Sequence, residues 1–158
     1  MKKYYKYSTD LCDLYIAEEN SHITNISFSK NFEGELLETK LIKEAFKQIE
    51  EYLQGKRKEF NLPLETKGTD FQNRVWNSLK KIPYGKTFSY KDIAVDIGNE
   101  KASRAVGNAN NKNPIVIVIP CHRVIGKNGK LVGYGGGISI KKKLLELEEK
   151  HSENKGTK

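Results

Sequence analysis

The sequence has few of the residues that build disulfide frameworks and metal centres. It contains two cysteines, Cys12 and Cys121, and three histidines among 158 residues. Because the cysteines lie far apart and belong to no multi-cysteine pattern, the composition indicates a reducing compartment, and we expect a cytoplasmic protein without disulfides. The same scarcity leaves no spacing of cysteine and histidine that would bind zinc, so we expect no metal.

Two further absences narrow the function classes. No segment approaches the roughly 20 apolar residues of a membrane-spanning helix, and no apolar stretch follows the basic N-terminus, so neither membrane insertion nor export is expected. Nucleotide-binding motifs are missing as well. The Gly85-Lys86-Thr87 triplet lacks the earlier glycine of a phosphate-binding loop, and the glycines between 133 and 137 lack the third glycine of a dinucleotide fingerprint.

The sequence has fewer acidic residues than basic residues. The chain has 20 Asp and Glu against 28 Lys and Arg, a formal net charge of +8. This excess suits a polyanionic partner such as nucleic acid and favours fast, salt-sensitive association, although many other basic proteins share it. At this length the chain can form one ordinary domain or two small lobes, and we expect two lobes.

Residues 1–66 predict a small α/β lobe. Apolar and polar residues alternate in short runs between residues 4 and 28, which is typical of strands joined by turns. Apolar residues then recur every three or four positions from Leu41 onward, and Gly55 follows them, so residues 39–54 are predicted to form a helix. Turn-forming residues just before Thr69 are expected to separate this lobe from the next.

Residues 67–149 predict a mainly helical lobe. Ser89 and Gly98 are expected to cap and to end the first of two short helices, which have the size and punctuation of a helix-turn-helix. Residues 115–119 predict a buried strand, because all five are β-branched. Residues 150–158 are polar enough to form a disordered tail. The helices of this lobe are predicted at 70–81, 90–97, 102–110 and 139–149.

The second helix of the predicted helix-turn-helix is unusual in its small side chains. Arg104 is its one long side chain. A helix that reads the major groove needs several Arg, Asn or Gln side chains, whereas small residues let a helix backbone approach the minor groove. We therefore predict minor-groove binding with Arg104 as the side chain that enters the base stack, although a tight helix–helix contact explains the small residues equally well. The small residues expected at the DNA are Ala102, Ser103, Ala105 and Gly107.

Cys121 lies in a chemically distinctive setting, between Pro120 and the pair His122-Arg123. Most cysteines at the end of a buried strand are simply small apolar residues. Here Pro120 fixes the backbone, and His122 can take the thiol proton directly or through a water. A thiolate attacks carbon far better than a thiol does, and a nearby cation favours the thiolate, so Arg123 is expected to lie close to the sulfur. The pattern predicts a nucleophilic cysteine.

Residues from about 69 to 148 resemble the catalytic lobe of the 6-O-methylguanine-DNA methyltransferases. The first 68 residues resemble the family only loosely, chiefly in residues 51–56 and 60–64. The resemblance implies an α+β fold, in which a ribonuclease H-like lobe of antiparallel sheet and helix precedes a winged-helix catalytic lobe with a helix-turn-helix. Five motifs carry it, in the same order and spacing: Gly85-Lys86-Thr87-Phe88-Ser89-Tyr90, Arg104-Ala105-Val106-Gly107, Asn113-Pro114, Ile119-Pro120-Cys121-His122-Arg123-Val124-Ile125 and Gly133-Tyr134.

The resemblance also implies catalytic roles for the matching residues. Cys121 matches the alkyl acceptor, and His122 matches the base that acts on it through a water. Glu148 matches the carboxylate that orients this histidine. Asn113 matches the hinge asparagine that ties the recognition helix to the segment carrying the acceptor. No cofactor is implied, because the methyl donor is the damaged base itself.

Further roles concern the DNA and the base. Arg104 matches the finger that replaces an extruded base in the duplex. Tyr90 matches the residue that pushes the target phosphate and contacts the flipped guanine. Gly135 stands where many relatives carry a larger side chain, so the pocket is expected to be roomier here. The positions assigned to the base pocket are Val124, Tyr134, Gly135 and Asn110.

The predicted function is DNA repair by direct reversal. The resemblance implies a monomeric methylated-DNA–protein-cysteine S-methyltransferase that binds double-stranded DNA carrying 6-O-alkylguanine, flips the base and moves its alkyl group irreversibly to Cys121. One alternative is a lesion-binding protein without repair activity, but such relatives replace the acceptor cysteine. Another is a transcription factor whose cysteine senses oxidation or alkylation, which the helix around Arg104, poor in base-reading side chains, argues against.

Overall fold

The computed structural model describes residues 1–131, 134 and 136–152, and it divides into two compact units. The first unit comprises Met1–Lys67 together with Pro114–Val118. The second comprises Gly68–Asn113 and the described residues from Ile119 onward. The chain therefore returns briefly to the first unit immediately before Cys121.

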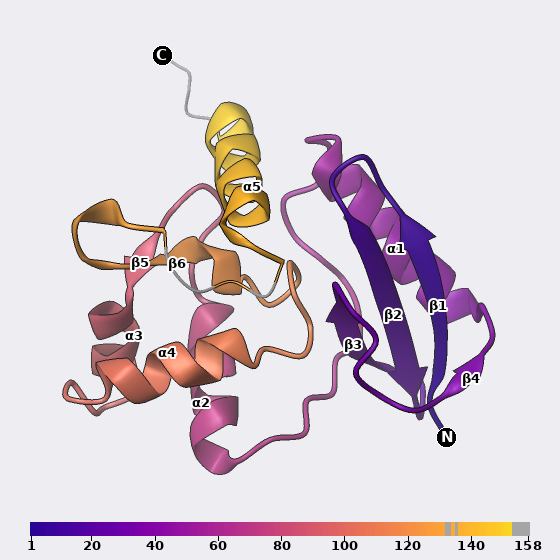
Figure 1. The fold of residues 1–158 in the computed structure, drawn as a ribbon, viewed down its shortest axis with the longest axis horizontal. Helices are drawn as coiled ribbons and strands as arrows, with labels where there is room; N and C mark the ends of the chain where they lie inside the picture. The colour runs from indigo at the N-terminus through magenta and orange to yellow at the C-terminus, as the bar shows by residue number, and fades with distance from the viewer. Residues whose placement is uncertain (132–133, 135, 153–158) are drawn as a thin grey trace. The chain divides into compact units, whose positions relative to one another are not determined.

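The first unit is a four-stranded sheet with a helix against one face (Figure 1). Its three long strands pair antiparallel, and the short fourth strand runs parallel to the first. Asn20 and Ser21 both have positive φ, 53° and 62°, and form the tight two-residue turn that suits the twist of a hairpin. The strands, in the spatial order β3-β2-β1-β4, are β1 (Lys3–Ser8), β2 (Asp13–Glu19), β3 (His22–Ser27) and β4 (Glu35–Leu36).

Helix α1 (Lys40–Leu53) completes the core of this unit. Thr39 caps it, because the Ile42 backbone N–H donates to the Thr39 hydroxyl at 3.1 Å. Gln48 is buried on the inner face, where its amide exchanges two hydrogen bonds, of 2.9 and 3.1 Å, with the backbone of Asn61. The helix predicted over residues 39–54 is confirmed, and so are the strands predicted before it.

Residues 115–119 do not form the strand predicted from their β-branched side chains. Ile115 makes a bridge to Ile26 of β3, with the Val116 N–H donating to the Ile26 carbonyl at 2.9 Å. Ile117 then adopts a φ of 72°, in the left-handed region that β-branched residues avoid, and the chain turns. Most of these side chains are buried, as predicted. The β-branched pattern therefore predicted burial correctly, but it predicted an extended backbone wrongly.

The second unit is mainly helical. Helix α2 opens with a reciprocal capping box between Thr69 and Gln72. Inside the unit, the Trp76 indole N–H donates to the carbonyl of Ala109 at 2.9 Å and so joins α2 to α4. The elements of this unit are α2 (Asp70–Leu79), β5 (Phe88–Ser89), α3 (Tyr90–Asp96), α4 (Ser103–Asn111), η1 (Cys121–Arg123), β6 (Val124–Ile125), η2 (Lys127–Gly129) and α5 (Ile138–His151).

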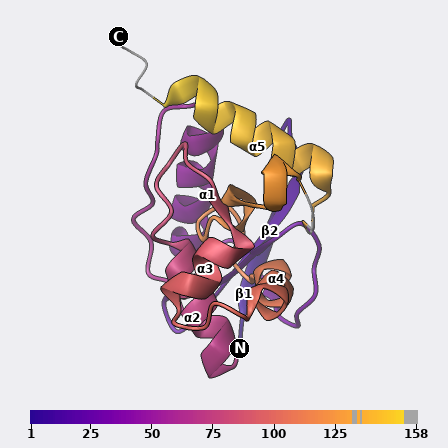
Figure 2. The same ribbon diagram turned by 90° about the vertical axis from the view of Figure 1, so that its left-hand side faces the viewer.

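Helices α3 and α4 form the predicted helix-turn-helix. Ser89 caps α3, and Gly98 follows it with a φ of 83°, a conformation that favours glycine. The two helices cross at a steep angle, with α4 seen nearly end-on in Figure 2. With the sheet lobe before them, they give the α+β fold that the sequence predicted.

The last helix differs from the prediction at its end. Helix α5 continues through His151, so residues 150 and 151 are helical and not part of a disordered tail. Residues 153–158 of the predicted tail lie outside the described residues. Within the described ranges, no helix combines the length and the apolar character needed to cross a membrane.

Candidate active site

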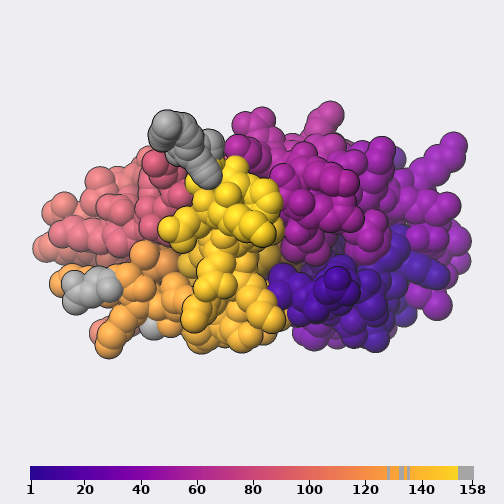
Figure 3. All heavy atoms as spheres, turned by 90° about the horizontal axis from the view of Figure 1, so that it is seen from above, coloured from indigo at the N-terminus to yellow at the C-terminus, as the bar shows by residue number. Residues whose placement is uncertain are grey.

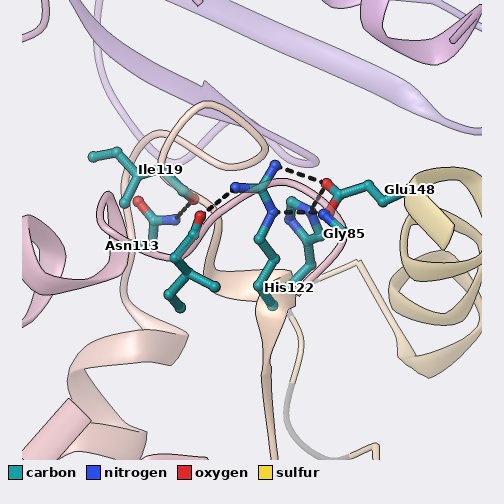
Figure 4. Close-up of polar contacts among 7 residues, drawn as sticks. Gly85, Asn113, Ile119, His122 and Glu148 are labelled. Atoms are coloured by element: carbon teal, nitrogen blue, oxygen red, sulfur yellow. Dashed lines mark hydrogen bonds and ion pairs between the residues drawn. The ribbon is translucent and has the colours of Figure 1, made fainter. Parts of the chain in front are cut away.

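Cys121 opens the short helix η1, and 3% of its surface is exposed. Two asparagines from the end of the helix-turn-helix hold the backbone around it. The Asn113 side-chain amide donates to the Ile119 carbonyl at 2.7 Å (Figure 4), and the Asn110 amide donates to the carbonyl of Cys121 itself at 3.4 Å. The segment that carries Cys121 is therefore tied by side-chain hydrogen bonds to the end of α4 and the residues just after it.

His122 and Glu148 form a buried pair beside this cysteine. The His122 Nε2 and Glu148 Oε2 atoms are 2.7 Å apart, and the side chains are 0% and 1% exposed. Glu148 projects from α5 toward η1, as Figure 4 shows. An ionised carboxylate only accepts hydrogen bonds, so His122 carries a proton on Nε2. The sequence prediction paired these two residues, and the structure places them in direct contact.

The same carboxylate also binds Arg123. The Arg123 Nε donates to Glu148 Oε1 at 2.8 Å and its Nη2 donates to Oε2 at 2.9 Å. Burial would raise the pKa of Glu148, but the bonds and charges of His122 and Arg123 outweigh it and lower the pKa to about 2. Arg123 was predicted to supply the cation beside the Cys121 sulfur. The structure shows this guanidinium bound to the carboxylate, and Lys141 is the cation whose charge lowers the pKa of the thiol.

A lysine that sequence reasoning missed lies near the sulfur instead. Lys141 on α5 is fully buried, and its charge acts on Cys121. It stands seven residues before Glu148, so both lie on one face of the helix. Burial raises the pKa of the Cys121 thiol to about 11, although the Asn113 hydrogen bond and the Lys141 charge oppose the increase. The resting thiol is therefore protonated at neutral pH and needs a base to ionise it.

Gly85 is a second contributor that was not assigned to the site. Its backbone N–H donates to Glu148 Oε1 at 3.1 Å, and its φ of 81° suits glycine (Figure 4). A Cβ at this position would also lie 2.9 Å from the Cβ of Ser152. The sequence signal was the Pro83-Tyr84-Gly85 turn, which gave no indication that its backbone faces a carboxylate 63 residues later.

The residues assigned to DNA lie on α3 and α4. Arg104 and Ala105 are exposed, while Ala102, Ser103 and Gly107 are partly exposed. The Tyr90 ring lies against Gly107, whose Cβ, if present, would be 3.7 Å from it. Burial raises the pKa of Tyr90, and Cys121 adds to the shift, so the phenol is protonated at neutral pH. Tyr90 therefore packs against α4 and interacts electrostatically with Cys121.

The residues assigned to the base pocket are only partly described. Val124 is fully buried on β6, directly after η1. Asn110 is buried on α4 and reaches the Cys121 carbonyl. Tyr134 is partly buried, and Gly135 lies outside the described residues.

Positive charge is concentrated in the half of the chain that carries this site. Residues 68–158 contain 17 of the 28 Lys and Arg but 8 of the 20 Asp and Glu, a net charge of +9, while the first 67 residues carry −1. Part of this charge lies on the solvent face of α5 (yellow in Figure 3), which carries the exposed residues Lys142, Lys143, Glu146, Glu149 and Lys150. A basic second unit suits a polyanionic ligand.

Comparison with known proteins agrees with this arrangement. The sequence profile of the 6-O-methylguanine DNA methyltransferase DNA binding domain matches residues 70–150, and that of the same family's ribonuclease-like domain matches residues 2–66. The chain belongs to the 6-O-methylguanine DNA methyltransferase family. This match confirms the resemblance found around Cys121. The match also covers the N-terminal lobe, where the sequence motifs were weak.

Individual relatives support the same assignment. A methylated-DNA–protein-cysteine methyltransferase of Methanosarcina acetivorans is 59% identical over 67% of this chain and 68% of its own length. The constitutive methylated-DNA–protein-cysteine methyltransferase of Bacillus subtilis is 46% identical over 94% of this chain and 96% of its own. The crystal structure of Mycobacterium tuberculosis OGT in complex with DNA matches with a TM-score of 0.87 and 43% identity, over 96% of both chains.

These findings confirm the enzyme class and the fold class predicted from the sequence. The protein is a DNA-repair alkyltransferase of the 6-O-methylguanine DNA methyltransferase family. Its second unit is the family's DNA-binding domain, and it holds Cys121 together with the buried His122–Glu148 pair.

Proposed function

We propose that the enzyme moves a methyl group, or a larger alkyl group, from O-6 of guanine in double-stranded DNA onto the sulfur of Cys121. The observation that carries this proposal is the buried pair His122–Glu148, 2.7 Å apart, next to a cysteine whose thiol is protonated at rest. A histidine oriented by a carboxylate is the arrangement that ionises a nucleophile at neutral pH. The transfer is stoichiometric and irreversible, and it needs no cofactor or metal.

The proposed reaction begins with the proton of the thiol. His122 holds its own proton on Nε2, so its Nδ1 takes the Cys121 proton, directly or through a water. The sulfur then attacks the alkyl carbon, forming the C–S bond as the C–O bond breaks, and the electron pair of that bond passes to guanine. Tyr90, protonated at neutral pH, donates to the guanine as its negative charge develops. The thioether left on Cys121 has no group to remove it, so each molecule acts once.

The proposed DNA contact explains how the base reaches the sulfur. The small residues of α4, namely Ala102, Ser103, Ala105 and Gly107, let the helix approach the minor groove, and the exposed Arg104 fills the space of the extruded base. Val124, Tyr134, Gly135 and Asn110 are assigned to the pocket for that base. Because Cys121 is 3% exposed in the free protein, productive binding has to expose the sulfur.

The remaining assignments complete the proposal. Residues 1–66 form an N-terminal lobe, residues 67–149 form the catalytic lobe, and Asn113 links the helix-turn-helix to the acceptor segment. The enzyme acts as a monomer. We place it in the cytoplasm, because a reactive thiol requires a reducing compartment.

The direct test is intact-protein mass spectrometry after incubation with a duplex that carries one 6-O-methylguanine. We expect the protein to become one methyl group heavier, peptide mapping to place that methyl on Cys121, and the amount of guanine restored to equal the amount of protein. Several lesions repaired per protein molecule, or a methyl on another residue, would reject the proposal.

The finger role of Arg104 makes a separate prediction. Arg104→Ala should slow methyl transfer from duplex DNA by about tenfold, since losing roughly 1.4 kcal/mol of support for the flipped state has that effect. Transfer from free 6-O-methylguanine base should be nearly unchanged, because no base has to leave a stack. Rates on both substrates, with the exposed Arg74→Ala as the matched control, test this. Equal losses on both substrates would contradict the assignment.

A further inference from the structure

The Arg123 side chain is fixed by contacts beyond its pairing with Glu148. Besides its two hydrogen bonds to Glu148, its Nη1 donates to the carbonyl of Ile82 at 2.7 Å. The ring of Tyr84 lies beside it, with the guanidinium carbon 5.6 Å from the ring centroid. A planar side chain fixed by three hydrogen bonds and a ring presents a rigid fork to the carboxylate.

The carboxylate accordingly receives at least four donors. Glu148 Oε1 accepts from Arg123 Nε and from the Gly85 N–H, and Oε2 accepts from Arg123 Nη2 and from His122 Nε2. Protonating Glu148 would break one of these bonds. The carboxylate therefore stays an anion, and the His122 proton stays on Nε2.

The positive charge of Arg123 also influences the protonation of His122. Beside Glu148 alone, the imidazole would bind a second proton readily, and an imidazolium cannot accept the thiol proton. The pKa of His122 is in fact lowered, first by burial; Glu148 opposes this, and the charges of Arg123 and Lys141 add to it. Within the described part of the chain, the titratable or charged groups that act on His122 or Glu148 are Arg123, Lys141 and Tyr84, and Cys121 adjoins His122 in the sequence.

We propose that Arg123 is a positioning residue for alkyl transfer: by clamping Glu148 as a permanent anion and cancelling its charge, it keeps His122 neutral, with Nδ1 ready to accept the Cys121 proton. This inference rests on the function proposed above. It goes beyond the pair His122–Glu148 in assigning the protonation state of the base to a third side chain.

The experiment compares three variants of the full chain. Arg123→Met removes the charge and the fork, Arg123→Lys keeps the charge but not the fork, and Arg74→Met removes an exposed arginine from α2 of the same unit. Methyl-transfer rates are measured under single-turnover conditions between about pH 5 and pH 9. In parallel, ring-nitrogen NMR follows the protonation and tautomer of His122.

The expected result is a shift in pH dependence. In Arg123→Met the acidic limb of the rate profile should move up by about one pH unit, giving about tenfold slower transfer well below the wild-type midpoint and a much smaller loss near pH 9. Arg123→Lys should lie between Arg123→Met and the wild type, and Arg74→Met should match the wild type. NMR should show the His122 pKa rising by the same amount as the limb.

Other outcomes separate the two proposals. A pH profile that keeps its wild-type midpoint in both Arg123 variants, however slow they are, would overturn the positioning role. If Arg123→Met does not fold, Arg123→Lys alone decides the point. If the wild type itself transfers no methyl group, the proposed function fails, while the NMR titration of His122 still tests whether Arg123 keeps the imidazole neutral.

Discussion

Cys121→Ser should abolish methyl transfer, lowering it by at least about a thousandfold. The hydroxyl is close to the thiol in size, so the buried site around it should be preserved. It is a far weaker acid, however, and His122 Nδ1 cannot ionise it to a useful extent. The variant should still bind methylated duplex, which separates loss of chemistry from loss of binding. Single-turnover transfer and DNA-binding assays on the same preparation measure the two effects.

Cys12 provides a matched control in the same chain. It is a free cysteine at the turn between β1 and β2, half-buried, and it lies in the first unit. Cys12→Ser should therefore transfer methyl at the wild-type rate. Residual repair by Cys121→Ser, or methylation found on Cys12, would show that the acceptor has been assigned to the wrong sulfur.

Glu148→Ala should lower the free energy of unfolding by about 3–5 kcal/mol and remove most of the transfer activity. The substitution leaves the guanidinium of Arg123 buried without its counter-charge, which costs far more than the loss of an exposed ion pair. It also removes the group that holds the proton on His122 Nε2. Urea unfolding at neutral pH measures the first effect. The neighbouring exposed Glu149→Ala should change the stability by no more than about 0.5 kcal/mol.

The pH dependence of this difference is a second readout. The pKa of Glu148 is about 2 in the folded protein against an ordinary 4.5. Its ionised form therefore stabilises the fold by roughly 3 kcal/mol above the ordinary pKa, and this contribution is lost as the pH falls from 4.5 toward 2. The gap in stability between wild type and Glu148→Ala should narrow over that range. A gap that stays constant, or a Glu148→Ala variant as stable as the wild type, would contradict the buried ion pair.

How well a feature could be predicted from the sequence depends on how far apart in the chain its interacting residues lie. Capping by Thr39 and Ser89, the glycine stop at Gly98 and the helix periodicities depend on residues within one or two turns, and the helices were predicted almost to the residue. The strand predicted over residues 115–119 was wrong, because β-branched side chains suit both a strand and a buried turn. Burial was correct there, but the backbone was not.

By itself, the sequence determined the helices, the basic character and the family signature around Cys121, because each depends on the residue types themselves or on neighbouring residues. The roles of Cys121, His122 and Glu148 in transfer remain predictions. Only the tertiary structure decided which charges meet: Arg123 pairs with Glu148, 25 residues away, and reaches the carbonyl of Ile82, 41 residues away, while the charge of Lys141 lowers the pKa of the Cys121 thiol. Packing and the need to neutralise buried charge determine such long-range partners, and a local sequence pattern contains no information about them.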